Sequence, residues 1–336
     1  MFADRSPSIT ELEKLRNSVI ITYATSDRRG METQIAEDIL GIFADHLDVI
    51  GDVDKISLFL YTRGGSTLTA WSLVNLIRNF CKDFEVIVPS KCHSSGTIIC
   101  LGANNVMMTK QATLGPIDPS TNGLFNPFVE HNNQKVKAPL SVEHVNSFIE
   151  LIKNEFNITD QTALSNIIIN LSNHIHPIAL GEVFRSKTQI QMIAKKLLSK
   201  QGITNEDAVT KIINFLCSES GSHDYTIYRN EAREELGLNI EKPDQNQYAL
   251  IKTIFKDLEG ELELTVPYEP NMYIGTNASY NYTLKRGIIE SNSYGSNIFV
   301  SEGVLTRQVV QQQTPVGVVN NTILNDTRSY EGWKKI

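Results

Sequence analysis

The sequence predicts an α/β protein built on a mainly parallel sheet, followed by a small, partly β C-terminal appendage. Residues 19–118 alternate strand-like apolar runs with helical apolar patterns at short spacing, which indicates parallel strands joined by right-handed crossovers. Small-residue turns follow two of these strands, at the edge where open α/β sheets place their sites. Helical patterns fade beyond residue 262, where Asn, Thr, Tyr, Val and Gly accumulate.

The first part of the chain contains the predicted strands and helices of this sheet. A capping-box pattern at residues 8–11, Ser-Ile-Thr-Glu, predicts the start of a short helix that ends at Leu15. Apolar, β-rich runs predict strands at 19–23, 56–61, 84–88 and 105–108. Two helices between them are predicted from apolar residues at helical spacing: Ile35, Ile39, Ile42 and Phe43, then Leu68, Trp71, Val74, Leu76 and Ile77.

The rest of the chain is expected to be mainly helical and then partly β. Residues 119–140 contain turn residues without periodicity, so we expect a loop or flap there. Apolar stripes predict helices within 141–216. Short strands are predicted at 297–300, 304–310 and 316–319. These patterns favour a domain over residues 1–243, which is large enough for an enzyme, and an appendage over residues 244–336.

Charge and cysteine usage argue against several classes of protein. The net charge of -7, without a Lys/Arg run, gives no overall attraction to nucleic acid or to an anionic membrane surface. No segment approaches the roughly 20 apolar residues of a membrane span, and no signal peptide is recognisable. The four cysteines include no CxxC pair, so we expect no metal site and reduced thiols in a cytoplasmic protein. No cofactor is predicted.

Two turns are candidates for the chemistry. Thr-Arg-Gly-Gly-Ser at 62–66 follows a predicted strand, and its glycines allow backbone amides to approach an anion or a developing oxyanion. A plain strand-to-helix turn is the alternative, since the spacing of phosphate-binding motifs is missing. Ser-Ser-Gly-Thr at 94–97 suits either a helix N-cap or a serine nucleophile. The two turns are expected to face each other across adjacent parallel strands.

Four blocks in order resemble the serine dehydrogenase proteinase family. They are TRGGS at 62–66, HSSGT with ICLGA at 93–103, ATLGPIDPS at 112–120 and SGSHDYTIYRNEAREELGL at 220–238. This family belongs to the Clp protease/crotonase superfamily and is related to the signal peptide peptidases. The resemblance covers roughly residues 19–240, and it implies a Clp/crotonase-like fold of stacked βα units.

The resemblance also implies a nucleophile and an oxyanion hole. In the superfamily the nucleophile lies two places before the glycine of an S-x-G motif, which is Ser94 here. Ser95 would then contribute its backbone amide to the oxyanion hole. The Gly-Gly turn would supply the other amide, from Gly64 or, preferably, Gly65.

The proton acceptor is less defined by the sequence. The family's Ser, Asp, His order implies Asp118 as the orienting acid and His223 as the general base. Signal peptide peptidases use a lysine instead, for which Lys135 and Lys137 are candidates. His93 adjoins the nucleophile, but neighbours at a helix start generally point apart. Four other histidines are expected to be structural or solvated: His131, His144, His174 and His176.

A second reading of the acidic residues stays open. Asp118 alternatively braces the turn of the GPIDP sequence, and Asp224 is then the candidate for the orienting acid. An aspartate directly beside the histidine it orients is unusual, because adjacent side chains rarely pair.

The leading hypothesis is a soluble serine peptidase that hydrolyses peptide bonds through a Ser94 acyl-enzyme. The superfamily resemblance implies a homo-oligomer. The appendage over residues 244–336 is expected to serve oligomerisation or regulation. One alternative is a crotonase-like acyl-CoA enzyme, whose two amides bind a thioester enolate. The other is a non-catalytic scaffold that uses the protease fold for binding.

Overall fold

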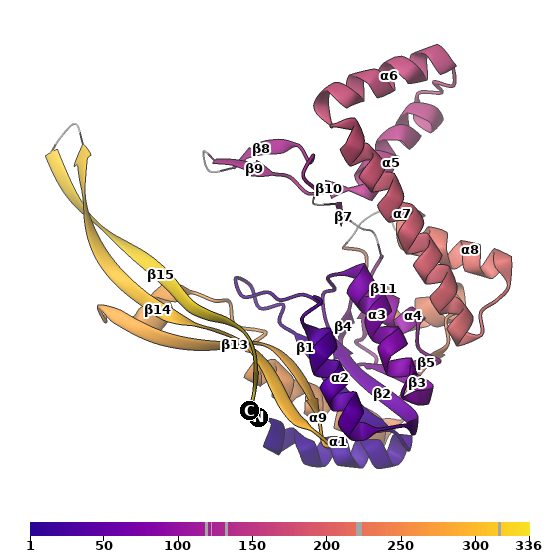
Figure 1. Cartoon of the computed structure of the whole chain (residues 1–336), viewed down its shortest axis with the longest axis vertical. Helices are drawn as coiled ribbons and strands as arrows, with labels where there is room; N and C mark the ends of the chain where they lie inside the picture. Colours follow the sequence, from indigo (N-terminus) through magenta and orange to yellow (C-terminus); the bar gives the residue numbers. More distant parts are fainter. Residues whose placement is uncertain (118–119, 122, 132–133, 220–223, 315–316) are drawn as a thin grey trace. The chain divides into compact units, whose positions relative to one another are not determined.

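The structure is a computed structural model that describes residues 1–117, 120–121, 123–131, 134–219, 224–314 and 317–336 (Figure 1). Its contacts divide the chain into two compact units. Unit 1 comprises residues 1–113 and 239–336, and unit 2 comprises residues 114–238. The predicted division at 243/244 is therefore not the division made by the contacts.

Unit 1 is built on one eight-stranded sheet, which confirms the predicted α/β class (Figure 1). Five strands run parallel, in the order β12, β5, β3, β2, β1. Their bounds are β1 (Val19–Thr25), β2 (Val53–Tyr61), β3 (Cys81–Val88), β5 (Asn105–Met108) and β12 (Ile240–Glu241). The four predicted strands are confirmed, and three of them are two to three residues longer than the apolar run that predicted them.

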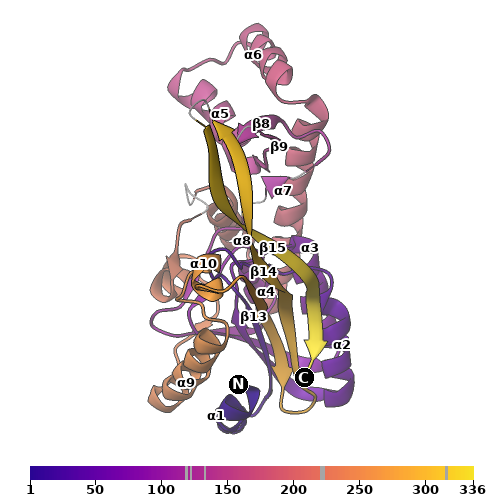
Figure 2. The same ribbon diagram turned by 90° about the vertical axis from the view of Figure 1, so that its left-hand side faces the viewer.

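Three antiparallel strands complete this sheet: β13 (Ser279–Ser291), β14 (Gly295–Thr314) and β15 (Gly317–Lys335). β13 pairs with β1, with Ile289 opposite Tyr23, and Figure 2 shows β13, β14 and β15 side by side. The C-terminal strands thus extend the main sheet, because the backbone of β13 pairs with the edge of β1. Beyond the pair Ser279–Thr306, β14 continues to pair with β15.

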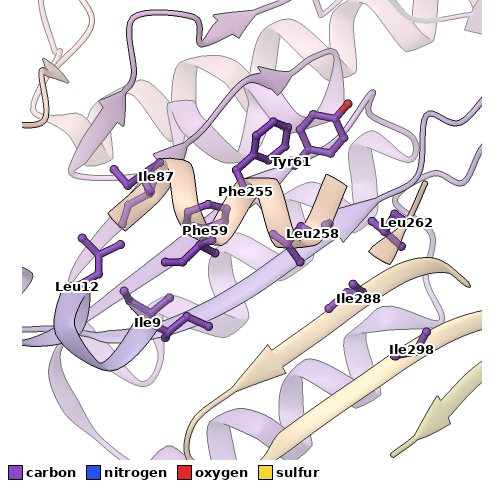
Figure 3. Packing of buried hydrophobic residues seen from close by; sticks show 14 of the residues in the cluster. Ile9, Leu12, Phe59, Tyr61, Ile87, Phe255, Leu258, Leu262, Ile288 and Ile298 are labelled. Carbon is purple, nitrogen blue, oxygen red and sulfur yellow. The ribbon is translucent and has the colours of Figure 1, made fainter. Parts of the chain in front are cut away.

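Helices cover both faces of the sheet. On one face lie α1 (Phe2–Arg16) and α9 (Gln245–Glu261), and on the other lies α2 (Ile39–Ile50), as Figure 2 shows for α9 and α2. The first face buries the cluster of Figure 3, which includes Ile9, Leu12, Phe59, Ile87, Phe255, Leu258, Ile288 and Ile298. On the second face Tyr23 meets Phe43 edge to face, with ring centroids 5.5 Å apart. Alternate residues of β1 thus supply both cores.

Unit 1 contains several further elements. They are α3 (Thr67–Arg78), β4 (Lys91–Cys92), α4 (Ser95–Leu101) and α10 (Pro270–Ile274), and β6 (Thr113–Leu114) begins at the end of this unit. Ser66 caps α3 by accepting a hydrogen bond from the Thr69 amide. Ile35, predicted in a helix, lies before α2 and forms an isolated bridge with Gly65.

The predicted start of the first helix is wrong. Helix α1 begins at Phe2, so residues 8–11 lie inside it rather than capping it. The reason is tertiary: Arg5 is fully buried and donates to both Glu290 carboxylate oxygens at 2.6 Å. These contacts order the turn that precedes Pro7, where local sequence signals favour a later start.

Unit 2 is mainly helical. Its helices are α5 (Val142–Glu150), η1 (Leu151–Glu155), α6 (Gln161–His174), α7 (Pro177–Leu198), η2 (Ser199–Gln201), α8 (Glu206–Asn214), η3 (Phe215–Glu219) and η4 (Glu231–Glu235). Ser141, Asp160 and Asn205 cap α5, α6 and α8 by accepting from backbone amides. The predicted helical character of residues 141–216 is confirmed. No helix of the described residues is both long and apolar enough to cross a bilayer.

The predicted loop over 119–140 needs a correction. It contains the short strands β7 (Ser120–Thr121), β8 (Phe128–His131), β9 (Gln134–Lys137) and β10 (Leu140–Ser141), and β11 (Ile227–Tyr228) follows later in this unit. β8 and β9 pair antiparallel, and β7 pairs with β10. Paired runs of only two to four residues leave almost no periodicity in the sequence, which explains the missed strands.

Candidate functional site

The two small-residue turns meet in unit 1, as the sequence predicts. Thr62 directly follows β2, and it forms an isolated parallel bridge with Cys92 at the end of β4. Within this bridge the Thr62 amide donates to the Lys91 carbonyl, and the His93 amide donates to the Thr62 carbonyl, both at 3.0 Å. The Gly-Gly turn and the Ser-Ser turn therefore begin at strand ends that are paired with each other.

Gly64 lies directly against Ser94. A methyl group on Gly64 would be 2.7 Å from Ser94 Cβ and 3.2 Å from Ser94 Oγ, closer than a side chain tolerates. The backbone of Gly64 also has φ +112°, a conformation that residues with a side chain rarely adopt. Gly65 is equally restricted, since a methyl group there would be 2.3 Å from the Ile35 carbonyl oxygen. The glycines thus permit the close approach of the turn to the Ser94 hydroxyl.

The backbone amides of the two turns are not equivalent. The Gly64 amide donates to Thr62 Oγ1 at 3.0 Å. Among the described residues, no acceptor is assigned to the amide of Gly65 or to that of Ser95. Ser95 is the first residue of α4, where backbone amides lack partners within the helix. Of the two glycine amides, that of Gly65 is consequently the one available to a ligand.

Ser94 has the backbone of a strained turn. Its φ is 52° and its ψ is -118°, a conformation uncommon for a residue with a side chain. Ser94 occupies the N-cap position of α4, yet its side chain makes no capping hydrogen bond. A serine that only capped the helix would make that bond, so the N-cap interpretation loses its main support. The strain is typical of a position that serves a site.

The two serines differ in exposure. Ser94 is partly exposed, whereas Ser95 is 1% exposed. The Ser95 hydroxyl is buried without a hydrogen-bond partner among the described residues. Only the Ser94 hydroxyl is therefore open to an attacking role at this turn.

Both other members of the predicted triad, Asp118 and His223, lie outside the described residues. The alternative bases Lys135 and Lys137 are in strand β9 of unit 2, and the Lys137 ammonium lies 5.9 Å from the centre of the Phe128 ring. Asp224 is exposed. The assignment of Asp118 as the orienting acid and of His223 as the general base therefore stays a prediction.

The other histidines have structural surroundings where they are described. His93 Nε2 is 2.9 Å from Thr113 Oγ1. His176 caps α7 through Nδ1 and stacks on Phe125, with ring centroids 4.6 Å apart. His174 ends α6, and His144 is exposed. Among the described residues, no group of three or more His, Cys, Asp or Glu side chains is arranged to hold a metal.

Cysteine chemistry is also disfavoured beside the turn. The sulfur atoms of Cys92 and Cys100 are 3.6 Å apart and buried. Burial raises the pKa of the Cys92 thiol, and the neighbouring Cys100 raises it further. A protonated, buried thiol is a poor nucleophile, so the serine remains the candidate.

Polar contacts that sequence patterns did not reveal brace the same region. Tyr61 donates to Asp27 Oδ1 at 2.7 Å, and the Lys91 ammonium pairs with the other oxygen of Asp27. Thr25 Oγ1 donates to Thr62 Oγ1 at 2.8 Å. These residues come from the ends of three strands, and only their convergence in the fold reveals the contacts.

Comparison with known proteins agrees with this geometry. Residues 34–144, which contain both turns, match the model of the ClpP-like SDH-type serine proteinases. This segment is similar to that family. The predicted family resemblance is thus confirmed. The matched SDH-type segment begins before Gly64 and ends beyond Asp118, so it includes the proposed nucleophile, the glycine turn and the proposed orienting acid.

Two known proteins are similar to parts of this chain. An uncharacterized protein of Methanocaldococcus jannaschii, MJ0137, is 24% identical over 261 residues, which are 74% of this chain and 77% of the relative. A second uncharacterized protein of that organism, MJ1495, is 33% identical over 64 residues, or 19% of this chain and 22% of the relative.

Two of the similar solved structures have a low sequence identity and a low TM-score. One is a variant of a 1510-N membrane-bound stomatin-specific protease, with 14% identity, a TM-score of 0.38, and coverage of 68% of this chain and 82% of that chain. The other is a ClpP1 variant from Listeria monocytogenes, with 13% identity, a TM-score of 0.37, and coverage of 70% and 99%. These values are too low to transfer a substrate or the role of a residue.

Proposed function

We propose that this protein is a serine endopeptidase whose nucleophile is Ser94. The observation that carries the proposal is the contact between the Gly64 backbone and the Ser94 hydroxyl, at a serine with a strained backbone. A glycine turn against a serine hydroxyl is the arrangement that acyl transfer requires, because backbone amides must reach the oxygen that becomes negative. The similarity of residues 34–144 to a serine proteinase family supports the same reaction.

The proposed reaction proceeds through an acyl-enzyme. Ser94 Oγ attacks the peptide carbonyl carbon, and its proton passes to His223, which Asp118 orients. The amides of Gly65 and Ser95 donate to the oxyanion of the tetrahedral intermediate. Collapse of this intermediate breaks the C–N bond as the base returns the proton to the leaving amine. Water then attacks the ester, and the same groups release the carboxylic acid and regenerate Ser94.

The nucleophile is tested by labelling with a fluorophosphonate. We expect the wild-type protein and Ser95→Ala to be labelled, and Ser94→Ala to be unlabelled. Ser95→Ala is the matched control, because it removes a neighbouring hydroxyl that is buried. An unlabelled wild-type protein that is folded would contradict the proposal, as would equal labelling of Ser94→Ala.

The general base is tested in the same assay with His223→Ala, Lys135→Ala and Lys137→Ala. Loss of a general base typically lowers the rate about 10²- to 10⁴-fold. We expect this loss for His223→Ala alone. A comparable loss for either lysine variant, with His223→Ala active, would assign the base to that lysine. Cleavage of casein by wild-type protein, absent in Ser94→Ala, would distinguish a peptidase from a scaffold.

We also propose a homo-oligomer in the cytoplasm. The four cysteines are free thiols, which is typical of a reducing compartment. Sedimentation of the full chain over a range of concentrations tests the assembly, and a single monomeric species at all of them would exclude it.

A further inference from the structure

Thr62 contacts both turns of the proposed active site. It is fully buried at the end of β2. Its hydroxyl, its methyl group and its backbone each make a different contact. Together these contacts join the turn of the oxyanion hole to the turn of the nucleophile.

The hydroxyl of Thr62 holds the glycine turn. Thr62 Oγ1 accepts a hydrogen bond from the Gly64 amide at 3.0 Å, and it lies 2.8 Å from Thr25 Oγ1. This bond fixes the orientation of the Arg63–Gly64 peptide, which comes directly before the peptide that carries the Gly65 amide. It also occupies the Gly64 amide, so that the next amide along the chain, that of Gly65, is the one left available to a ligand.

The methyl group and backbone of Thr62 hold the serine turn. A methyl group placed on Gly96 would lie 2.6 Å from Thr62 Cγ2, which shows that the Thr62 methyl fills the space beside the first turn of α4. The backbone of Thr62 bonds to Lys91 and His93 on either side of Cys92. Thr62 thereby fixes the strand end from which Ser94 follows.

We propose that Thr62 is a positioning residue, which sets the distance between the Gly65 amide and the Ser94 hydroxyl. The inference rests on the proposed function, since it concerns the oxyanion hole of that reaction. The effect is expected in the chemical step rather than in binding, because the oxyanion forms only after attack. A misplacement of about 1 Å at such a site can lower the rate on the order of 10²-fold.

Thr62→Val tests the hydroxyl. The variant keeps the shape and the methyl group but leaves the Gly64 amide without its acceptor. The probe is a fluorophosphonate, whose phosphoryl oxygen occupies the oxyanion hole while Ser94 Oγ forms the P–O bond and fluoride leaves. We expect the maximal labelling rate to fall roughly 10- to 100-fold, with the half-saturating probe concentration changed less than threefold.

Thr25→Val is the matched control. It removes the other hydroxyl of the same buried pair, which is 2% exposed, and it leaves the bond from the Gly64 amide to Thr62 intact. Its labelling rate should stay within about threefold of the wild-type rate, although its unfolding free energy falls about as much as that of Thr62→Val. A Thr62→Val rate equal to that of folded Thr25→Val would overturn the inference.

A second pair of variants covers the case in which Thr62→Val does not fold. Thr62→Ser and Thr62→Ala both lack the methyl group and differ only in the hydroxyl. Thr62→Ser should label at least tenfold faster than Thr62→Ala, and equal rates would overturn the inference. If the wild-type protein is not labelled, the proposed function fails; if it is labelled and these comparisons show no difference, only the role of Thr62 fails.

Discussion

A buried histidine joins α2 to the C-terminal strands. His46 Nδ1 lies 2.8 Å from the Ser291 hydroxyl, and Nε2 lies 3.1 Å from Asn297 Oδ1. In the neutral tautomer Nε2 donates to Asn297, and Nδ1 accepts from Ser291. Burial lowers the pKa of His46, and Lys335 lowers it further, although the bond to Asn297 and the charge of Asp45 act in the other direction. The fold therefore favours the uncharged ring.

This histidine predicts a pH-dependent stability. Its pKa is lower in the folded state, so the unfolded chain binds the proton more readily. The contribution of His46 is complete above its ordinary pKa of about 6.5 and is lost as the pH falls from there towards the folded pKa. The free energy of unfolding in urea should therefore fall more between pH 7.5 and pH 5.5 for the wild type than for His46→Gln. Equal losses would show that His46 is not the titrating group.

At this scale the sequence predicted part of the site. The S-x-G spacing and the family resemblance selected Ser94, and its exposure and strained backbone support that choice. The Gly-Gly sequence selected the turn, but it gave no physical reason to prefer the Gly65 amide over the Gly64 amide. That reason is the hydrogen bond from the Gly64 amide to Thr62, which the structure reveals. Thr62 itself was not recognised, because its contacts with Thr25 and with residues 91–96 join positions about 30 to 40 apart in the chain. Asp118 and His223 remain predictions.

At the scale of single elements, helix α1 depends on a buried ion network. Arg5 donates to Glu290 and Glu261 at 2.6 Å, and it also pairs with Asp257. Burial lowers the pKa of Arg5, but its bonds to Glu290 and the other carboxylates raise it beyond the ordinary value. Burial raises the pKa of Glu290, while the bonds from Arg5 oppose that rise. Each of the two side chains thus stabilises the charged form of the other.

Breaking this pair on one side should be costly. Arg5→Met leaves Glu290 buried without its cation, and the expected loss in unfolding free energy is about 3–5 kcal/mol. The double variant Arg5→Met with Glu290→Leu should recover a large part of that loss, because no buried charge remains unpaired. Denaturant unfolding of the two single variants and the double variant measures the coupling. Additive losses would mean that the two side chains do not stabilise each other.

Element positions were predicted best where the chain is buried on both faces. The four parallel strands of residues 19–108 are continuous apolar runs, and each was found at its predicted place. The start of α1 and the short strands of residues 120–141 were not predicted. The former depends on Arg5 meeting residues about 250–285 positions later, and the latter are too short to show a period.

At the scale of the whole molecule, the C-terminal segment is predicted to be inseparable from the sheet. A chain of residues 1–243 would lack α9 and β13, which would expose the edge of β1 and the cluster side chains Ile9 and Leu12. We expect this fragment to aggregate or to lack cooperative unfolding, by size-exclusion chromatography and circular dichroism.

The matched control removes the distal part of the β14–β15 ribbon. Replacing residues 308–323 by Asn-Gly shortens the β14–β15 ribbon beyond β13 and leaves the β1–β13 pairing intact. This variant should remain soluble and unfold cooperatively. A soluble 1–243 fragment with cooperative unfolding would instead support the division at 243/244 that the sequence suggested.

The pairing of β1 with β13 also bears on how the protein is made in the cell. β1 leaves the ribosome early, whereas its partner follows about 260 residues later. At the usual rate of about 5–20 residues per second, this delay is on the order of 10–50 s. During that time the nascent sheet has an unpaired edge and part of its apolar face is uncovered. Folding on the ribosome therefore cannot be completed domain by domain, and a chaperone that shields strand edges should raise the yield of native protein.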